Sequence, residues 1–432
     1  MTADADTIFA VASGAGRAAI AVVRVSGDGA GTVLARLCGR VPPARRASLR
    51  SLRDAGGEIL DRAVVLWCPA PSSYTGEDSA ELFLHGGPAV VAGVCETLVA
   101  LGGRPAEPGE FTRRAFFNGR MDLLEAEAVA DLVEAESSAQ RRQALRQLDG
   151  ALGALYRGWA ERLTRLCAQQ EALIDFPDEA LPDGQEAAML AEVDTVLAEI
   201  EGHLDDDRRG ERLREGLVIA IAGAPNAGKS TLINALVGRD VAIVAPTAGT
   251  TRDVLEARAV FGGVPVTLLD TAGVRASDDP IESEGVRRAR ARAAAADLVV
   301  LVQDGTDDIA PAVPGGRRLV VASKADLGAD GRSADVAVSA LTGLGMAQLR
   351  ERLGAIAQDL AGAAGPPALT RPRHRAALLG AAGALRRARE ASQAELRGED
   401  FRTALLEFGR ITGRIGAEQV LDSVFGQFCI GK

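Results

Sequence analysis

The pattern of apolar and polar positions divides the chain into stretches with different periodicities. Up to about residue 118, short apolar runs such as Ile20–Val25 and Ala63–Trp67 alternate with Gly- and Pro-rich turns, which is typical of strands in an α+β domain. From Asp122 to about Leu204, apolar residues recur at three- and four-residue spacing and glycine is sparse, which predicts amphipathic helices.

Strands and helices alternate again from Leu217 to about Leu353, and a linker rich in Gly, Pro and Ala at 361–367 leads into helical sequence that runs to Phe428. Helical sequence on both sides of an α/β block indicates an insertion, with the two flanks packing together as one bundle. We therefore expect a multidomain α/β protein with an N-terminal α+β domain over 1–118, a discontinuous helical domain over 119–212 and 366–432, and an inserted α/β domain over 213–365.

The composition narrows the class of protein. The 432 residues are 47% hydrophobic and 25% charged, which fits a folded, soluble protein of about two to four domains. No apolar run approaches the roughly 20 residues of a membrane span, and the acidic N-terminus lacks the features of a signal peptide, so we expect a cytoplasmic protein. Five scattered cysteines without a CxxC pair argue against disulfides or zinc. With a formal net charge of −10, any contact with nucleic acid needs a local basic patch or a partner.

The strongest chemical motif is a G-x-x-x-x-G-K-S sequence over Gly223–Ser230. It follows the apolar strand Leu217–Ala222 and opens a predicted helix at Thr231, which is the context that a phosphate-binding P-loop requires. Backbone N–H groups of such a loop approach phosphate oxygens, and the helix N-terminus adds a favourable dipole. We expect Lys229 to be catalytic, as a cation for the β- and γ-phosphates, and Ser230 to supply a hydroxyl to Mg²⁺.

Three further segments follow in the order that a GTPase requires. Gly249–Arg252 offers threonine hydroxyls to the Mg²⁺ shell and the γ-phosphate, and Asp270–Gly273 offers a carboxylate to a metal-bound water and an N–H group to the γ-phosphate. In Ser323–Asp326, the Asp326 carboxylate can accept hydrogen bonds from guanine N1–H and its 2-amino group, a pair that adenine cannot offer. Ser339–Leu341 adds a backbone contact to the base. The ordered set predicts a Ras-like P-loop GTPase domain.

Two sets of residues follow from these motifs. We expect GTP to be bound by Asn226, Ala227, Gly228, Lys229, Ser230, Thr231, Ala245, Pro246, Thr247, Ala248, Gly249, Thr250, Thr251, Asp270, Thr271, Ala272, Gly273, Ser323, Lys324, Ala325, Asp326, Ser339, Ala340 and Leu341. We expect magnesium to be bound by Ser230 and Thr251.

Two positions depart from what these motifs usually contain. Ser323 stands where the guanine motif usually begins with Asn, and we expect it to weaken one base or loop contact while Asp326 still discriminates. Val274 follows Gly273, where Ras-like domains commonly carry a water-positioning Gln. Glu282 is the candidate to orient the attacking water. A solvated loop charge is the alternative, and the resemblance described next favours the catalytic interpretation.

Segments along the whole chain resemble the tRNA-modification GTPase MnmE (TrmE) family. Besides the nucleotide motifs, they are Asp6–Ile8, Tyr74–Asp78 with Glu81, His85–Pro88, Pro108–Thr112, Arg120–Leu123, Ile174–Asp178 and Phe428–Lys432. The terminal pentapeptide together with the P-loop sequence Pro225–Ser230 is very specific, because unrelated GTPases would share only the latter.

The resemblance implies a one-carbon chemistry on tRNA. It implies that the N-terminal domain is a folate-binding domain, takes a tetrahydrofolate one-carbon derivative and forms a homodimer. With an FAD-containing partner of the MnmG (GidA) type, the family adds an aminomethyl or carboxymethylaminomethyl group to carbon 5 of the wobble uridine of certain tRNAs. Motif matching places Arg24, Glu81, Arg120 and Lys432 at the folate site. Without the family, Arg24 and Glu81 are equally well explained as a surface charge and its salt-bridge partner.

The resemblance also implies stimulation by potassium. We expect K⁺ to be held by Asn226, Ala245, Thr247 and Thr250, in the place of an arginine finger. For Asn226, a loop-stabilising role is the alternative.

Cys429 in the tail has two open interpretations. It is either a nucleophile or transient sulfur carrier, and so catalytic, or a small packing residue that seats the tail. Six arginines on the returning helices are likewise either a patch for tRNA phosphates or a solvated helix face. They are Arg371, Arg373, Arg375, Arg386, Arg387 and Arg389.

A different class of function remains as the alternative. A regulatory GTPase switch for ribosome assembly or signalling would predict a KH-type RNA-binding module or a membrane anchor, and the sequence shows neither. A folate enzyme with a vestigial GTPase domain is opposed by the nearly intact nucleotide motifs.

Overall fold

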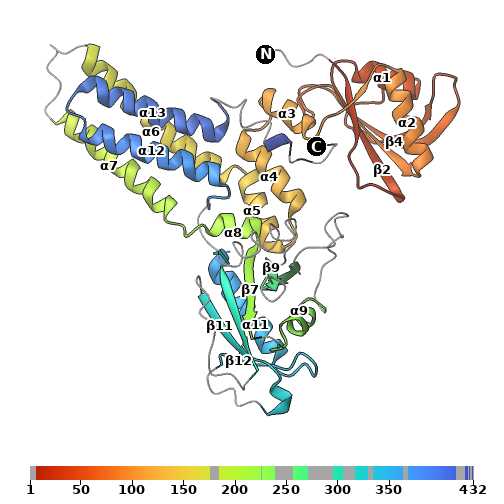
Figure 1. The fold of residues 1–432 in the computed structure, drawn as a ribbon. Helices are drawn as coiled ribbons and strands as arrows, with labels where there is room; N and C mark the ends of the chain where they lie inside the picture. The colour runs from red at the N-terminus through yellow and green to blue at the C-terminus, as the bar shows by residue number, and fades with distance from the viewer. Residues whose placement is uncertain are drawn as a thin grey trace, which may run out of the picture. The chain divides into compact units, whose positions relative to one another are not determined.

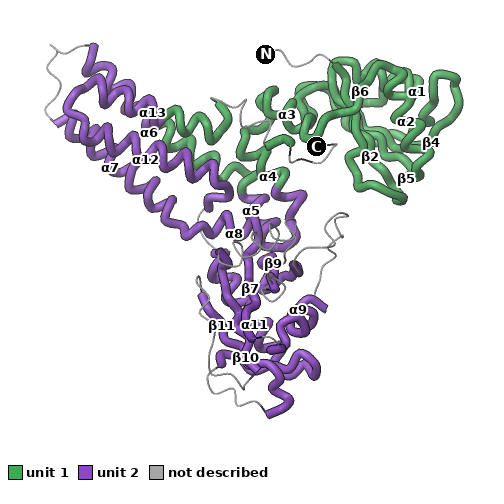
Figure 2. The backbone as a smooth tube through the Cα atoms, in the orientation of Figure 1, with its two compact units in different colours: residues 1–130, 147–161, 405–432 green, residues 131–146, 162–404 purple. Residues whose placement is uncertain are grey.

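The computed structural model describes residues 6–175, 184–224, 226–238, 256–270, 295–304, 317–328, 334–362, 368–414, 424–426, 428 and 431. The chain forms two compact units, one of residues 1–130, 147–161 and 405–432, and the other of residues 131–146 and 162–404 (Figure 2). Among the described helices, none combines the length and the apolar character needed to cross a membrane.

The first unit is built on a six-stranded sheet with the order β3-β4-β5-β2-β1-β6. Its strands are β1 (Ile8–Val11), β2 (Ala18–Ser26), β3 (Ser48–Arg53), β4 (Ile59–Cys68), β5 (Ser79–Gly86) and β6 (Arg104–Pro105). Helices α1 (Ala30–Cys38) and α2 (Pro88–Ala100) pack on one face, where alternate strand residues such as Val23, Val65 and Leu82 form the core. The predicted α+β domain is confirmed.

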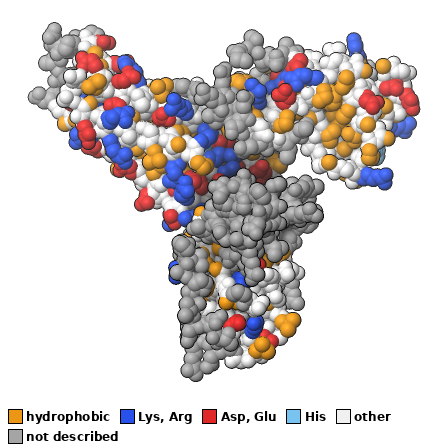
Figure 3. All heavy atoms as spheres, viewed as in Figure 1, with side chains coloured by type: hydrophobic (Ala, Val, Ile, Leu, Met, Phe, Trp, Pro, Cys, Tyr) orange, Lys and Arg blue, Asp and Glu red, His pale blue; other side chains and the backbone are white. Residues whose placement is uncertain are grey.

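The other face of this sheet carries a row of apolar side chains. The register places Leu49, Val64, Phe83 and Val22 opposite one another across β3, β4, β5 and β2. Residues directly opposite in antiparallel strands share a face, so these four side chains are neighbours. Leu49 is 67% exposed and Val64 is 39% exposed, and Figure 3 shows hydrophobic side chains gathered on this unit. We call these four residues the apolar row.

The rest of the first unit is helical and includes the C-terminal residues. It contains α3 (Glu110–Phe117), most of α4 (Leu123–Glu134) and parts of α6 (Ala151–Asp175) and α13 (Ala394–Thr412). Tyr156 and Trp159 pack against Phe408, with ring centroids 6.5 and 6.0 Å away. Phe425 and Phe428 pack with Leu123 at the start of α4.

The second unit contains the remaining helices of the predicted bundle. These are the larger part of α5 (Ser138–Leu148) and of α6, together with α7 (Gln185–Leu204), α8 (Arg209–Glu215), α12 (Pro372–Glu390) and the first part of α13. α7 and α12 lie side by side (Figure 1), although about 170 residues separate them along the chain. Helices from before and after the inserted segment therefore pack together within this unit, as the pattern predicts.

The inserted segment forms a second six-stranded sheet with the order β12-β11-β10-β7-β9-β8. Its strands are β7 (Leu217–Gly223), β8 (Glu256–Phe261), β9 (Val264–Asp270), β10 (Leu298–Gln303), β11 (Arg317–Ala322) and β12 (Val336–Ala337). All pairings are parallel except that of β8 with β9. Helices α9 (Lys229–Val237) and α11 (Met346–Ala361) share a core with this sheet. On one side of β7 the sheet continues with β9 and β8, and on the other with β10, β11 and β12, so the strand order reverses at β7. In sheets of this kind, ligands bind beyond the carboxyl end of the strand at which the order reverses.

Candidate functional site

The P-loop lies at the carboxyl end of β7. The strand ends at Gly223 and α9 begins at Lys229, so the loop joins a central strand directly to a helix N-terminus. Gly223 is required here, since a Cβ at this position would come 2.2 Å from the backbone oxygen of Val302 on β10. Asn226 has a positive φ of 64°, which is uncommon for a residue with a side chain. This conformation suits a loop whose N–H groups turn toward a bound anion.

Two side chains of this loop are positioned for phosphate and metal. Lys229 is buried, and its Nζ donates to the main-chain oxygens of Gly223 (3.0 Å) and Ala224 (2.6 Å), which leaves one of its three protons for a phosphate oxygen. Ser230 Oγ donates to Asp270 Oδ2 at 2.9 Å. A hydroxyl and a carboxylate side by side are hard oxygen ligands of the kind that Mg²⁺ takes, so these residues fit that ion.

The predicted base-reading loop follows β11 and lies next to the P-loop. Ser323 Oγ donates to the main-chain oxygen of Ala227 (2.7 Å), and the oxygen of Gln303 lies 3.1 Å from the same hydroxyl. Asp326 lies in the short 3₁₀ helix Ala325–Leu327, and its carboxylate has no partner among the described residues. Ala325 N donates to Val338 O at 3.1 Å, which fastens this loop to the segment of Ser339. The structure therefore brings the phosphate and base motifs together.

A second cluster surrounds Arg24 on the first unit's sheet. Arg24 on β2 lies opposite Glu81 on β5, and its Nη2 donates to Glu81 Oε1 at 2.9 Å. The Arg24 guanidinium also lies 4.9 Å from the ring centroid of Tyr74 and 5.6 Å from that of Phe111. Burial raises the pKa of the Tyr74 phenol, and its hydroxyl is hydrogen-bonded to Thr112 (2.8 Å). The cluster combines a cation, a carboxylate, the partly exposed ring of Tyr74 and the fully buried ring of Phe111.

A partly buried ionic network is centred on Arg114 of helix α3, the helix that also carries Phe111. Arg114 contacts three carboxylates: Asp6 (2.6 Å), Glu110 (3.0 Å) and Glu77 (3.3 Å). Arg104 on β6 also pairs with Asp6 and Glu110. Burial alone would raise the pKa of Glu110, but the hydrogen bonds from Arg104 and Arg114 outweigh it and the pKa lies below its ordinary value.

Comparison with known proteins matches the whole chain. A family model described as the MnmE helical domain matches residues 123–429, and one described as the N-terminus of the GTP-binding protein TrmE matches residues 7–120. The "tRNA modification GTPase MnmE" of Gluconacetobacter diazotrophicus is 58% identical over 434 residues, covering 98% of each chain. That of Rhodospirillum rubrum is 52% identical over 453 residues, covering 99% of each. The chain belongs to the MnmE family of tRNA modification GTPases.

Solved structures show a more limited likeness. The G domain of the T. maritima FeoB iron transporter is 25% identical, covering 33% of this chain and 99% of that chain, with a TM-score of 0.24. The bacterial selenocysteine-specific elongation factor EF-Sec is 21% identical over 33% of this chain and 29% of that chain, also with a TM-score of 0.24. A likeness at this TM-score supports no conclusion about the fold of this chain.

Several residues predicted for the MnmE nucleotide site lie outside the described residues. They are Ala245, Pro246, Thr247, Ala248, Gly249, Thr250, Thr251, Thr271, Ala272, Gly273 and Glu282. Cys429 and Lys432 of the tail also lie outside the described residues. Their roles stay predictions.

The third predicted folate residue, Arg120, lies beside the loop that carries Tyr74. A Cβ at Gly76 would come 3.1 Å from Arg120 Cγ, so the side chain packs on this glycine. Arg120 also lines a cavity of about 370 Å³ together with Asp122, Arg157 and other residues. Among the described residues no hydrogen bond or ion pair joins Arg120 to Arg24 or Glu81.

Gly431, the one described residue among the last four of this MnmE chain, lies against the N-terminal sheet. A Cβ at Gly431 would come 2.7 Å from the main-chain oxygen of Val11 and 2.8 Å from Ala12 Cα. Val11 ends β1, the strand that pairs with β2, where Arg24 lies. Gly431 therefore lies at the sheet that carries the Arg24 cluster.

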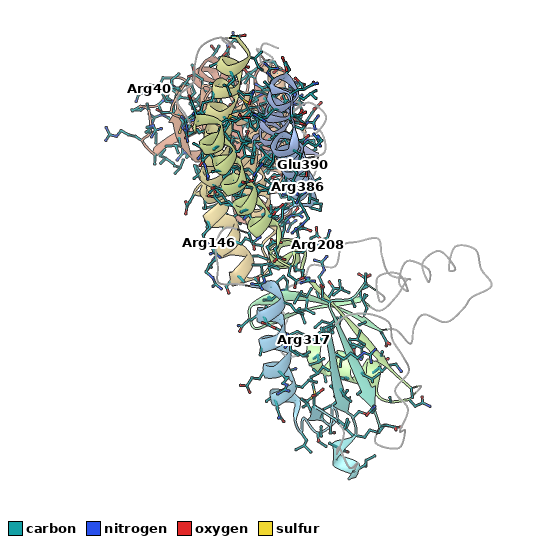
Figure 4. The ribbon with its side chains drawn as sticks, turned by 90° about the vertical axis from the view of Figure 1, so that its left-hand side faces the viewer. Arg40, Arg146, Arg208, Arg317, Arg386 and Glu390 are labelled. Atoms are coloured by element: carbon teal, nitrogen blue, oxygen red, sulfur yellow. The ribbon has the colours of Figure 1, made fainter. Side chains whose placement is uncertain are left out.

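Most arginines of the returning helices are paired, which favours the helix-face interpretation over a free basic patch. Five of the six form ion pairs with carboxylates of the helical segments: Arg371 with Asp131, Arg375 with Asp206 and Glu211, Arg386 with Glu201, Arg387 with Asp400, and Arg389 with Asp194. Arg386, for example, extends from α12 (Figure 4) and its Nη2 lies 2.5 Å from Glu201 Oε1. The six arginines therefore form a largely neutralised helix face and not a free basic patch.

Sequence reasoning missed other residues of the Arg24 cluster and of the ionic network of Arg104 and Arg114. Tyr74, Phe111 and the carboxylates of Asp6 and Glu110 lie within segments that resemble the family, but no function was assigned to them. Those segments lie far apart along the chain, and only the sheet brings them together. The resemblance of all these segments to one family was the only sequence feature that could have indicated that they lie close together.

Proposed function

We propose that this MnmE-family chain, with an FAD-containing partner of the MnmG (GidA) type, modifies carbon 5 of the wobble uridine in certain tRNAs. The group added is aminomethyl or carboxymethylaminomethyl, and its one-carbon unit comes from a tetrahydrofolate derivative. Family membership supports a GTPase in tRNA modification. The observation that supports the finer proposal is the Arg24–Glu81 cluster, which lies on a different unit from the nucleotide motifs.

The nucleotide site is proposed to bind and hydrolyse GTP. Lys229 holds the β- and γ-phosphates, and Asp326 accepts from N1–H and the 2-amino group of guanine. Ser230 and Asp270 fit Mg²⁺, with Thr251 as a further ligand, and the ion would neutralise charge on the phosphates.

Potassium and the attacking water complete the proposed hydrolysis site. Asn226 has an exposed side chain at the edge of the P-loop, which leaves its amide oxygen accessible to a monovalent ion. Backbone and side-chain oxygens of Ala245, Thr247 and Thr250 would complete that site. Glu282 orients the attacking water, because the chain has Val274 where Ras-like domains carry glutamine.

The Arg24 cluster is proposed to hold the folate. The Glu81 carboxylate has two acceptor oxygens for the N–H donors of a pterin ring, and the partly exposed Tyr74 offers an aromatic ring beside them. Arg120 meets the negatively charged glutamate end of the folate, and Lys432 approaches from the tail. The position of Gly431 beside Val11 supports this arrangement.

A homodimer is proposed through the N-terminal domains. The apolar row lies on the same face of the sheet as Arg24 and Glu81, as strand alternation requires. A second copy would cover this row and remove its apolar surface from water. We place the protein in the cytoplasm, where tRNA and GTP are found. The domain limits remain those proposed from the sequence.

Nucleoside mass spectrometry tests the modification. tRNA from cells that lack this protein should lose the wobble-uridine modification, and the intact chain should restore it. A regulatory GTPase switch without modification chemistry would leave these uridines unchanged in the deletion strain.

Folate binding tests the second site directly. Calorimetry with 5-formyltetrahydrofolate should show binding by the intact chain and a loss of about tenfold or more for Glu81→Gln, which removes a charged acceptor. Glu96→Gln is the matched control, because it makes the same change at an exposed position on α2. Equal affinity in the two variants would refute the folate assignment of Glu81.

A further inference from the structure

Ser323 occupies the first position of the base-reading loop, and its hydroxyl points into the protein. The residue is 6% exposed, and its Oγ lies 2.7 Å from the oxygen of Ala227 and 3.1 Å from that of Gln303. Both neighbours are carbonyl oxygens, so both can only accept. A hydroxyl can donate one hydrogen bond, and here a main-chain oxygen accepts that bond.

This hydrogen bond joins the base-reading loop to the P-loop. Ala227 is fully buried, so its carbonyl would lose a partner if the hydroxyl turned elsewhere. A buried carbonyl without a partner is costly, which holds the hydroxyl in its present direction. Ser323 is thus a positioning residue that sets the distance between the loop that reads the base and the loop that holds the phosphates.

Other donors of this loop are also used inside the protein. The N–H of Ser323 donates to Gln303 O (2.7 Å), and that of Ala325 donates to Val338 O (3.1 Å). The Lys324 ammonium lies 3.6 Å from the Asp304 carboxylate. Asp326, when ionised, offers only acceptors. Guanine N7 is itself an acceptor, so a contact to it requires a donor.

We propose that this protein recognises guanine through its N1 and 2-amino edge and leaves N7 without a hydrogen bond from Ser323. Ser323 replaces the usual Asn, and it keeps the contact between the loops while giving up the contact to the base. The proposal rests on the guanine site proposed above.

Competition binding to the full chain tests this proposal. GDP, 7-deaza-GDP, IDP and ADP each compete with a fluorescent GDP, and the affinity of each is measured. 7-deaza-GDP lacks the N7 acceptor and should bind within about threefold of GDP. IDP lacks the 2-amino group and should bind roughly tenfold or more weaker, because a hydrogen bond to the charged Asp326 is lost. ADP should not compete.

Three variants separate positioning from base contact. Ser323→Thr keeps the hydroxyl and should leave the ratio of GDP to 7-deaza-GDP affinity unchanged. Ser323→Ala loses the bond to Ala227 and should weaken GDP about five- to tenfold, with the ratio of GDP to 7-deaza-GDP unchanged. Ser323→Asn carries two amide protons, one for Ala227 and one for N7, and should prefer GDP over 7-deaza-GDP about fivefold or more.

The outcomes distinguish this proposal from the one on which it rests. If the intact chain disfavours 7-deaza-GDP fivefold or more and Ser323→Ala removes that preference, the hydroxyl reads N7 and the inference is wrong. An unchanged ratio in Ser323→Asn would also overturn it, since the first loop position would then not face N7. If ADP competes as well as GDP, or GDP does not bind, the guanine site itself is wrong.

Discussion

At the level of single residues, hydrogen bonds within the protein hold the nucleotide loops in place. Lys229 is fixed by two main-chain oxygens and Ser323 by one, so each side chain is oriented without a nucleotide. Groups that are already oriented need little reorganisation when the phosphates arrive. We expect substitutions at some residues to change nucleotide affinity and substitutions at others to change the rate of GTP hydrolysis.

Asp326→Ala should remove the preference for guanine. The variant loses a charged acceptor for two donors of the base, so GTP affinity should fall roughly 100-fold and approach that of ATP. Isothermal titration with GTP and ATP measures both. Asp359→Ala, an exposed carboxylate on α11, is the control and should bind as the intact chain does. Comparable affinity for ATP in the intact chain would contradict the guanine site.

Glu282→Ala should slow hydrolysis without weakening binding. An interaction made mainly in the transition state lowers kcat and leaves affinity nearly unchanged, and loss of a water-orienting carboxylate should cost roughly 100-fold or more. Single-turnover hydrolysis with fluorescent GTP measures the rate, and Glu351→Ala on α11 serves as control. Normal turnover in the Glu282 variant would exclude this role.

The cation makes a separate prediction at the same site. Hydrolysis by the intact chain should be faster in potassium than in sodium at equal ionic strength, because the larger ion fits a site of carbonyl and amide oxygens. Asn226→Ala should reduce that difference. Equal rates in the two salts would count against a potassium site.

At the level of elements, α8 ties the inserted domain to the helices. Glu211 of α8 is buried and pairs with Arg375 of α12 (2.8 Å), and Arg212 pairs with Asp297 before β10 (2.9 Å). Gly210 is required, because a Cβ there would come 2.2 Å from the oxygen of Leu369. The two chain segments that lead into and out of the insertion are therefore held together at one point.

Glu211→Gln should destabilise this junction. Arg375 keeps Asp206 as a partner, so we expect a loss of about 1–2 kcal/mol in the free energy of unfolding and not the larger cost of an isolated buried charge. Urea unfolding measures the change. Glu171→Gln breaks an exposed pair with Arg402 and should change stability by less than about 0.5 kcal/mol. Equal effects of the two variants would contradict a structural role for the junction.

The ionic network between α3, β6 and the residues before β1 predicts a dependence on pH. The folded pKa of Glu110 lies below its ordinary value of 4.5, so the folded state favours the ionised form. The resulting stability is full above pH 4.5 and is lost as the pH falls through the lower folded pKa. The unfolding midpoint of the chain should fall over this acidic range, and Glu110→Gln should flatten that decline. An unchanged slope would contradict the role of Glu110.

At the level of the whole molecule, nucleotide binding and modification are proposed to use different parts of the chain. The described nucleotide residues belong to the second unit, whereas Arg24, Glu81 and the described tail residues belong to the first. Removal of Cys429–Lys432 should therefore leave GTP binding and basal hydrolysis close to intact, and should abolish wobble-uridine modification in complemented cells. Full modification by the truncated chain would contradict the tail assignment.

The sequence alone determined the elements and motifs whose residues are local. The strand, the glycines and the helix start of the P-loop lie within about fifteen residues, so their spacing specifies the structure directly. The helical flanks of the insertion were also predictable, because helical periodicity is a local property. Membership of the family followed from short motifs, each contiguous along the chain.

Tertiary structure decided every feature that depends on distant partners. Arg24 and Glu81 are 57 positions apart and become neighbours only through the register of β2 and β5. The sequence left open whether Ser323 loses a base contact or a loop contact, and the bond to Ala227, 96 positions away, shows that the loop contact is kept. The arginines of α12 suggested a basic patch when only the sequence was considered, but packing against α7 places carboxylates beside them. A charge pattern along the chain does not specify its partners, because those are chosen by how the elements pack.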